Sequence, residues 1–311
     1  MWEKRGMIFG VDRLNDKMVS HALGPTVLLR RDSIRVYFSS RDDHSRSYPY
    51  YADLDLENPS EVTRIVEEPL LELGALGTFD DDGVMPCSVV RLSDGVIYLY
   101  YVGWNRGVTV SYRNSIGLAV SVDGGDSFER MFEGPVIDRH KNEPHMAASP
   151  CVMKEGDLWH CWYTSGNRWT DVNGKAEPVY TIRYACSNNG FDWVRDGKEC
   201  MAQVSEYEAF ARPTVIKDRG LYRMWYNYRS SFDYRNGEGS YRIGYAESGD
   251  ARSWVRKDLE AGISCSESGW DSLMQCYPCV VENDDRLLMF YNGNGFGKSG
   301  LGYAECHRGG S

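Results

Sequence analysis

The sequence has little that would point to a membrane or a nucleic acid as a partner. Residues 1–11 contain no apolar run long enough for a signal peptide or a membrane span, so we expect neither and predict a cytoplasmic protein. The net charge is −10, whereas a surface for nucleic acid or anionic lipid needs a basic patch. The sequence therefore predicts no nucleic-acid and no membrane partner.

Patterns typical of disulfides and metal sites are also missing. The nine cysteines are an odd number, and most lie inside apolar, strand-like runs, which predicts reduced thiols. Cys276 and Cys279 form one Cys-x-x-Cys pair, but no second pair with the spacing of zinc ligands follows it. The histidines and carboxylates have no local ligand spacing of a known site. We therefore expect no metal and no cofactor.

Helical periodicity is absent, since no long stretch has apolar residues at i, i+3 and i+4. Instead, 21 tyrosines and 9 tryptophans favour strands, and 32 glycines favour turns. Similar apolar runs begin at five prolines spaced by 61, 64, 63 and 65 residues: Pro25, Pro86, Pro150, Pro213 and Pro278. Each is followed by a second run with an aromatic residue 13 to 15 positions after the proline, and by a third run ending in alanine.

A fourth element appears in the middle repeats. There, a Ser/Asp/Asn/Gly turn leads into an aromatic residue, in Ser121–Phe128, Ser187–Trp193 and Ser248–Trp254, which is a hairpin signal. Four strands in each of five repeats predict an all-β fold, a five-bladed β-propeller with four-stranded antiparallel blades. No linker interrupts the repeats, so we expect one domain over residues 1–311.

The two ends of the chain complete this interpretation. The last repeat stops near Cys306 without a fourth strand, and Trp2–Phe9 precede the first repeat. We expect this N-terminal segment to supply the missing strand and close the ring, which removes two open sheet edges. A frayed N-terminal tail is the alternative.

Acidic residues recur shortly before the prolines, where the first strand of each blade would approach the axis. Three of them follow an aromatic residue, in Phe79-Asp80, Tyr207-Glu208 and Trp270-Asp271. Neighbouring carboxylates raise one another's pKa, so that one stays protonated beside an ionised partner. Such a pair suits glycosidic bond cleavage. We therefore predict Asp80, Glu208 and Asp271 as catalytic, while turn capping is the structural alternative.

Other polar residues near the same end are candidates for substrate contacts. His21, Asp81, His145 and Arg212 precede the inner strands, although capping or solvent exposure is the more ordinary role for Asp81. Arg41 and Arg229 follow the second strands of their repeats, and an arginine there suits a sugar carboxylate or phosphate by bidentate bonding. A surface salt bridge is the alternative for both.

At these residues the chain resembles the five-bladed-propeller glycosidases, the superfamily of glycoside hydrolase families 43, 32, 68, 62, 117 and 130, and within it a branch of glycosidase-like bacterial proteins. The resemblance extends over nearly the whole chain and rests on seven segments: Ser20–Pro25, Val36–Asp42, Phe79–Pro86, Glu208–Pro213, Tyr241–Glu247, Gly269–Asp271 and Tyr291–Gly295. It implies a propeller fold and a carbohydrate-active pocket.

The resemblance does not carry the catalytic residues of these families over. Families 43 and 32 have an acid directly before the first proline, and this chain has Gly24 there. They also have a general-acid Glu two residues before a later proline, and this chain has Ala148 or Ala211 at the corresponding position. Family 130 uses a basic site that binds phosphate, and the resemblance implies Arg212 and Arg229 as the residues that would form it here. The catalytic assignment therefore depends on Asp80, Glu208 and Asp271 as read from this chain alone.

Three functions remain open on this basis. The first is a glycoside hydrolase that cleaves a glycosidic bond in a small or biosynthetic glycan or an activated sugar. The second is a glycoside phosphorylase or sugar-transferring enzyme, which would depend on phosphate. The third is a carbohydrate-binding propeller without catalysis, since function does not follow from fold. The clustered acids favour an enzyme.

Overall fold

A computed structural model describes residues 1–235 and 237–307. This part of the chain contains twenty β-strands and two 3-10 helices, η1 (Asp258–Glu260) and η2 (Asn294–Gly297). Neither helix is longer than four residues. The all-β prediction is therefore confirmed.

The strands form groups of four. The first two groups are β2 (Ser20–Leu29), β3 (Ser33–Arg41), β4 (Ser47–Asp55) and β5 (Val62–Ile65), then β6 (Gly83–Arg91), β7 (Ile97–Arg106), β8 (Tyr112–Ser121) and β9 (Glu129–Arg130). The next two are β10 (Ala147–Glu155), β11 (Leu158–Val172), β12 (Lys175–Ser187) and β13 (Val194–Glu199), then β14 (Glu208–Asp218), β15 (Leu221–Ser230), β16 (Arg242–Ser248) and β17 (Val255–Arg256). The last contains β18 (Cys276–Asn283), β19 (Arg286–Asn292), β20 (Leu301–His307) and β1 (Glu3–Phe9).

Neighbouring strands within a group pair antiparallel, which confirms the predicted four-stranded antiparallel sheets. One parallel bridge, between Ser47 and Gly83, joins the first two groups into a single larger sheet. In the last group β1 lies antiparallel to β20, with Glu3 opposite Glu305 and Phe9 opposite Leu301. The two ends of the described chain therefore share one sheet.

Trp2 fixes the start of β1. Its side chain is 8% exposed, its ring meets that of Trp225 edge-on at 5.5 Å, and its backbone N–H donates to the Gly262 carbonyl at 3.1 Å. An aromatic pair of this kind contributes about 0.5–1.5 kcal/mol beyond the area that it buries. The N-terminal segment is packed against the neighbouring group and is not a frayed tail.

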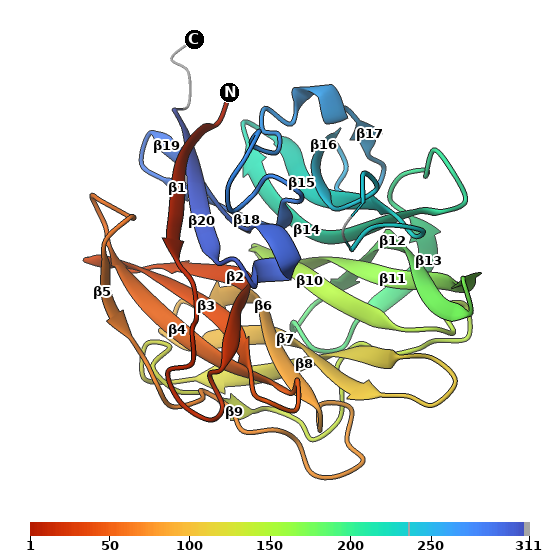
Figure 1. Cartoon of the computed structure of the whole chain (residues 1–311), viewed down its shortest axis with the longest axis horizontal. Helices are drawn as coiled ribbons and strands as arrows, with labels where there is room; N and C mark the ends of the chain where they lie inside the picture. The colour runs from red at the N-terminus through yellow and green to blue at the C-terminus, as the bar shows by residue number, and fades with distance from the viewer. Residues whose placement is uncertain (236, 308–311) are drawn as a thin grey trace.

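The first strand of each group lies near the centre of the molecule. We call these five strands the inner strands: β2, β6, β10, β14 and β18. Each lies beside the next one, and β18 lies beside β2. Figure 1 shows them near the middle, with β5, β9, β13 and β17 toward the periphery. Residues at one end of the inner strands therefore converge.

The turns before the outer strands are built as the Ser/Asp/Asn/Gly pattern predicts. The Ser121 hydroxyl accepts from the Gly125 N–H at 2.9 Å, and the Ser187 hydroxyl accepts from the Gly190 N–H at 3.0 Å. In the third turn, the Asp250 carboxylate accepts from the N–H groups of Arg252 and Ser253. These hydrogen bonds satisfy the backbone of a tight turn, which is why short polar residues are needed there.

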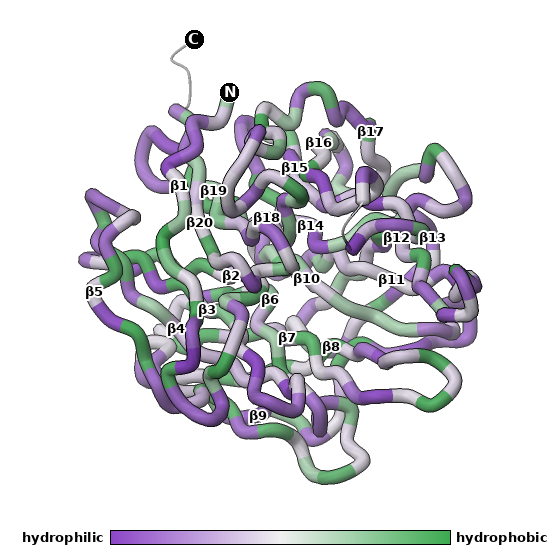
Figure 2. Tube along the Cα trace, viewed as in Figure 1, coloured by the Kyte–Doolittle hydropathy of each residue, from purple (hydrophilic) through white to green (hydrophobic). Residues whose placement is uncertain are grey.

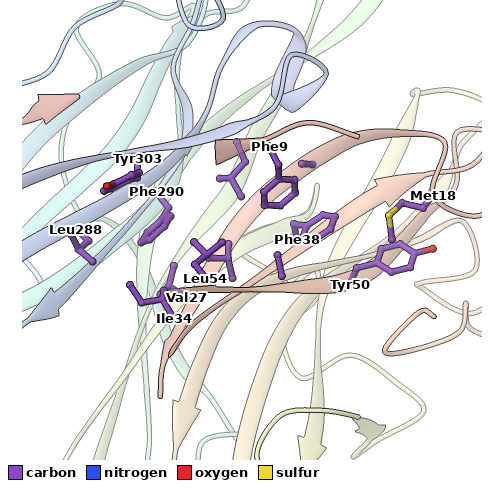
Figure 3. Packing of buried hydrophobic residues seen from close by; sticks show 14 of the residues in the cluster. Phe9, Met18, Val27, Ile34, Phe38, Tyr50, Leu54, Leu288, Phe290 and Tyr303 are labelled. Carbon is purple, nitrogen blue, oxygen red and sulfur yellow. The ribbon is translucent and has the colours of Figure 1, made fainter. Parts of the chain in front are cut away.

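The hydrophobic core lies between neighbouring groups of strands. In Figure 3, Phe9 and Phe38 pack together, with ring centroids 5.2 Å apart, while Phe290 and Tyr303 stack at 5.8 Å on the adjoining strands. Hydrophilic residues are prominent in the peripheral turns of Figure 2. Because the strands are buried between groups on both faces, they carry apolar runs and not a strict alternation.

Candidate binding site in the axial cavity

A kink at the X–Pro step of the inner strands turns side chains toward the centre. The residue before the proline has a positive φ in four of the five: Gly24 (69°), Ser149 (44°), Arg212 (50°) and Tyr277 (55°). The strand register shifts at the same steps. A left-handed residue before a proline is strained unless it is glycine, so the strain applies to Ser149, Arg212 and Tyr277. A bulge re-aims side chains. Recurrence of this strain around one centre marks that end of the strands as a candidate site.

Side chains just after the prolines hold the inner strands to one another. The Val152 N–H donates to the Ser88 hydroxyl at 2.9 Å, and the Val280 N–H donates to the Thr214 hydroxyl at 3.0 Å. The Val215 N–H donates to the Cys151 sulfur at 3.3 Å. Burial raises the pKa of the Cys151 thiol to about 12, so it stays protonated. This cysteine therefore acts as a small hydrogen-bond acceptor between strands.

A cavity of about 290 Å³ opens at the kinked end of the inner strands, and we call it the axial cavity. Seven aromatic rings line it: Trp104, Tyr112, Tyr180, Tyr234, Tyr241, Tyr277 and Phe296. The polar lining groups are Ser45, Ser47, Asn114, Ser149 and Thr164, and the charged ones are Arg41 and Arg235. No Asp or Glu occurs among the described lining residues. The volume is near the lower end of the range of about 300–1,000 Å³ for small-molecule sites.

Arg212 lines a second cavity of about 140 Å³ between the inner strands. Its side chain is 1% exposed and donates to the Pro25 carbonyl at 2.6 Å, the Thr26 hydroxyl at 2.8 Å and the Pro86 carbonyl at 3.3 Å. Arg212 does not line the axial cavity. Arg212 thus joins three groups of strands, and the expected substrate contact is not seen in its geometry.

Arg229 lies behind the aromatic wall. It is 2% exposed, donates to the Pro178 carbonyl at 2.9 Å and the Tyr241 hydroxyl at 3.1 Å, and its guanidinium lies 3.9 Å from the Tyr234 ring centroid. Such cation–π contacts are strongest where water is excluded. Arg229 positions the tyrosines of the wall, and it does not itself line the cavity.

The three acids predicted as catalytic are buried in three separate networks. Asp80 accepts from the Tyr101 hydroxyl at 3.0 Å and from Arg130 at 2.8 Å. Glu208 accepts two hydrogen bonds from Arg256, at 2.7 and 2.8 Å. None of the three lines the axial cavity. The expectation that they meet in one pocket is not met, because each is occupied by a partner within its own group of strands.

The partners of Asp271 all bond to its Oδ2, while its buried Oδ1 has none. Asp271 accepts from Lys4 at 2.8 Å, from the Tyr291 hydroxyl at 3.0 Å and from Gln275 at 3.0 Å. Burial acts to raise the pKa of this carboxyl, but the hydrogen bonds from Lys4, Ser266 and Gln275 outweigh it and lower the pKa below its usual range. Asp271 is thus held as a carboxylate, and its bond to Lys4 ties β1 to the last group.

A shared structural cause explains why the acids recur. In four groups the aromatic residue of the second strand is a tyrosine whose hydroxyl meets a carboxylate: Tyr101 with Asp80, Tyr163 with Glu143, Tyr226 with Asp258 and Tyr291 with Asp271. Burial and the adjacent carboxylate raise the pKa of each hydroxyl. The first group has Phe38 at this position. Asp80 and Asp271 thus belong to a repeated Tyr–carboxylate anchor, whereas Glu208 does not and is held by Arg256.

Arg41, in contrast, reaches the axial cavity from the end of β3. Its buried Nε has no hydrogen-bond partner, and no ion pair to Arg41 occurs within the described chain. Burial lowers the pKa of this guanidinium. His21, which has a φ of 70°, lies close enough to Arg41 for the arginine charge to act on it. Burial has the largest effect on this imidazole, followed by the charges of Arg41 and Lys298, and together they lower the pKa of His21 to about 4.

The depressed pKa of His21 makes stability sensitive to acid. Between pH 6.5 and about 4 the unfolded chain protonates this imidazole while the folded chain does not, so folded-state stability falls as the pH drops through that window. We expect His21→Asn, which tolerates the left-handed backbone, to lose less stability than the wild type between pH 7 and 4. Urea unfolding in phosphate-free buffer measures this, with the exposed His44→Asn as control. Equal losses in wild type and His21→Asn would contradict it.

Asp81 and His145 lie outside the axial cavity. The Asp81 carboxylate accepts from the Gly77 N–H at 2.8 Å, which is the capping role weighed against catalysis. His145 lines a neighbouring cavity of about 180 Å³ together with Asp138, Arg113 and Arg139. Asn114 lines both cavities, so they adjoin. Sequence analysis missed Asp138, which follows a short bridge between Ile116 and Ile137 and has no repeat counterpart.

Solved structures place this architecture in a known class. The chain superimposes on a structure of BT0996 in a complex named for RGII, with a TM-score of 0.75 at 16% identity, covering 98% of this chain and 92% of that protein. A structure named "Glycoside hydrolase" gives a TM-score of 0.74 at 16% identity, covering 100% of this chain and 93% of that protein. A structure from a study of the GH130 family, which that study describes as mannoside phosphorylases that include glycoside hydrolases, gives a TM-score of 0.72 at 14% identity. The match covers 99% of this chain and 94% of that protein. The fold is that of the glycoside hydrolase-like propeller proteins, as the resemblance implied.

Sequence relatives define the family more narrowly. Two proteins of Mycobacterium tuberculosis strains, "Uncharacterized protein MT1551" and "Uncharacterized protein Rv1502", are each 37% identical to this chain over 305 residues, covering 97% of it and 98% of the relative. The chain belongs to the family of these mycobacterial proteins. No protein-family model matches the sequence. Within the described residues, no helix has the length and apolarity to span a membrane, and no cluster of His, Cys, Asp and Glu is arranged for a metal.

Proposed function

We propose that the chain is a carbohydrate-active enzyme that holds a sugar unit of a small or biosynthetic glycan, or of an activated sugar, in the axial cavity and cleaves its glycosidic bond. The observation that carries the proposal is the lining of that cavity, on a fold shared with glycoside hydrolase-like propellers. Function does not follow from fold alone, so the proposal depends on the chemistry of the lining.

The lining suits a sugar ring. Trp104, Tyr277 and Phe296 offer faces on which the apolar side of a sugar can stack, and Ser149, Thr164 and Asn114 offer groups that can bond its hydroxyls. A few polar groups among aromatic walls are typical of a small-molecule site. The kinked backbone holds Ser149 and Tyr277 in place, since their positive φ values persist only where the surroundings enforce them.

The acid–base groups of this proposal come from the adjoining cavity. Asp138 supplies a carboxylate there and His145 an imidazole, and both line the cavity that adjoins the axial cavity at Asn114. Cleavage of a glycosidic bond needs a proton for the leaving oxygen and a base for the attacking water. We assign these tasks to Asp138 and His145, and assign Asp80, Glu208 and Asp271 to structural anchoring.

Substitution of Asp138 tests this assignment. We expect Asp138→Asn to lower kcat/KM at least about 100-fold toward whichever member of a panel of aryl glycosides and sugar nucleotides the wild type cleaves. The exposed Asp157→Asn, in the turn before β11, is the matched control and should keep full activity. Circular dichroism checks the fold, because Asp138 accepts a hydrogen bond from Ser115 at 2.7 Å. Full activity of a folded Asp138→Asn protein would refute the role.

Addition of phosphate separates hydrolysis from phosphorolysis in the same panel. Turnover without phosphate indicates a hydrolase, and turnover only with phosphate indicates a glycoside phosphorylase. The absence of Asp and Glu from the described axial lining favours a second candidate, a carbohydrate-binding propeller without catalysis. Binding of a sugar without turnover of the panel would support that candidate.

The same proposal includes the finer architecture. We propose one domain over residues 1–311, of which 236 and 308–311 lie outside the described part, built as a five-bladed ring closed by β1. The pairing of β1 with β20 and the adjacency of β18 and β2 support it. We also propose a cytoplasmic location, which the nine unpaired cysteines support, because reduced thiols are typical of that compartment.

A further inference from the structure

The arginines around the axial cavity differ in one respect, which is whether the protein itself satisfies them. Arg235 pairs with Glu177 at 2.9 Å. Arg229 and Arg212 donate to backbone carbonyls and hydroxyls. Arg41 is the one of these four that combines three features. It lines the cavity, its buried Nε lacks a hydrogen-bond partner, and it forms no ion pair inside the described chain.

Arg41 is half-buried, and the burial of its unpartnered Nε without a counter-charge is costly, because the hydration of that group is lost without compensation. Arginine is the side chain best suited to hold a carboxylate or phosphate, since its planar fork presents parallel N–H donors. His21 lies beside Arg41, because Ser20 is opposite Arg41 in the strand register. Lys298, an exposed residue, lies near His21 and not at Arg41 itself, since the preceding Gly297 approaches the Ala22 carbonyl. The charges of both Lys298 and Arg41 act on His21.

We propose that Arg41, with His21 beside it, binds an anionic group of the ligand, so that the substrate class is an acidic sugar such as a sugar phosphate or a uronic acid. The inference deepens the proposed function and depends on it for the location of the sugar. The aromatic rings of the cavity take the sugar ring, and the guanidinium takes the carboxylate or phosphate at the β3 end.

Occupancy of this site would also complete its electrostatics. A bound anion supplies the counter-charge that Arg41 lacks and offsets the two positive charges that act on His21. No carboxylate of the described chain competes for the position, because Asp42 is occupied by Arg46 at 2.7 Å and Glu177 by Arg235. The site is thus preorganised for an anion from outside.

Isothermal titration calorimetry tests the inference with glucose 1-phosphate, glucuronate, glucose and inorganic phosphate as probes. We expect the acidic sugars to bind more tightly than glucose, and Arg41→Gln to weaken their binding at least about tenfold, the size of one charge-assisted bond. Arg41→Lys should retain part of the affinity. The exposed Arg31→Gln, at the opposite end of β2 and β3, removes the same charge away from the cavity and should change nothing.

The probes also distinguish the source of the anion. If inorganic phosphate binds with the same Arg41 dependence and strengthens the binding of glucose, the anion is free phosphate beside a neutral sugar, and the Arg41 site stands. Unchanged binding of every acidic probe to a folded Arg41→Gln protein would overturn the inference. So would tight binding of glucose with no binding of any anion, an outcome that would leave the proposed carbohydrate function intact. Failure of all probes to bind the wild type would count against both.

Discussion

Glu208→Gln is expected to destabilise the folded protein by about 3 kcal/mol. Glu208 is 7% exposed and receives two hydrogen bonds from Arg256, while its carboxylate also accepts from the Val204 N–H at 2.8 Å. Removing one partner of a buried ion pair costs about 3–5 kcal/mol when the other charge is left alone, and Arg256 keeps a second partner, Asp258 at 2.6 Å. Glutamine keeps one acceptor oxygen, so we place the effect at the lower end. Urea unfolding monitored by circular dichroism measures it.

Two further variants make this experiment specific. Glu206→Gln removes a carboxylate two residues away whose side chain is 67% exposed, and we expect a change below about 0.5 kcal/mol. Arg256→Gln combined with Glu208→Gln should cost less than the sum of the single changes, because the two residues interact directly. A Glu208→Gln protein of full stability that has lost only its activity would restore a catalytic role for this residue.

Arg212→Met is expected to produce a loss of comparable size, about 3 kcal/mol. The substitution leaves the carbonyls of Pro25 and Pro86 and the Thr26 hydroxyl without their donor at the centre of the molecule. Each buried polar group left unsatisfied costs about 1–3 kcal/mol, and relief of the buried charge offsets part of the sum. The free energy of unfolding from urea titration is the readout.

A graded series separates the hydrogen bonds of Arg212 from its charge. Arg212→Lys keeps the charge and some donors, so its stability should fall between those of wild type and Arg212→Met. Arg219→Met, at an exposed turn residue that also has a positive φ, is the control and should change stability little. A stabilised Arg212→Met protein would show that the cost of the buried charge exceeds the value of the bonds that join three groups of strands.

Sequence reasoning succeeded where the information is periodic. The prolines from Pro25 to Pro278 mark the same step inside each inner strand, because a proline fixes φ. Polar turns such as Ser121–Phe128 mark strand ends, because short polar side chains satisfy turn backbones. The all-β class and the four-stranded antiparallel sheets followed from that periodicity. The pairing of β1 with β20 was also anticipated, since a repeat that lacks a strand leaves an unpaired edge.

The candidate site was harder to predict because its residues follow no repeat. Asp80, Glu208 and Asp271 attracted attention by recurring, but recurrence in a repeated fold also marks a shared structural need, and here it marks carboxylates held by tyrosines or arginines. The cavity residues Tyr234 and Phe296 come from irregular segments between strands, whose position is set by packing.

By itself, the sequence determined the class of fold and the four-stranded antiparallel sheets, because these depend on local periodicity and turn chemistry. Only the tertiary structure decided which charges are neutralised inside the protein and which face the cavity. Within the described chain, Arg41 lines the cavity with an unpartnered Nε and no ion pair, whereas Arg212 and Arg229 bond carbonyls from distant strands. That distinction depends on contacts between residues far apart in the chain, which no local pattern encodes.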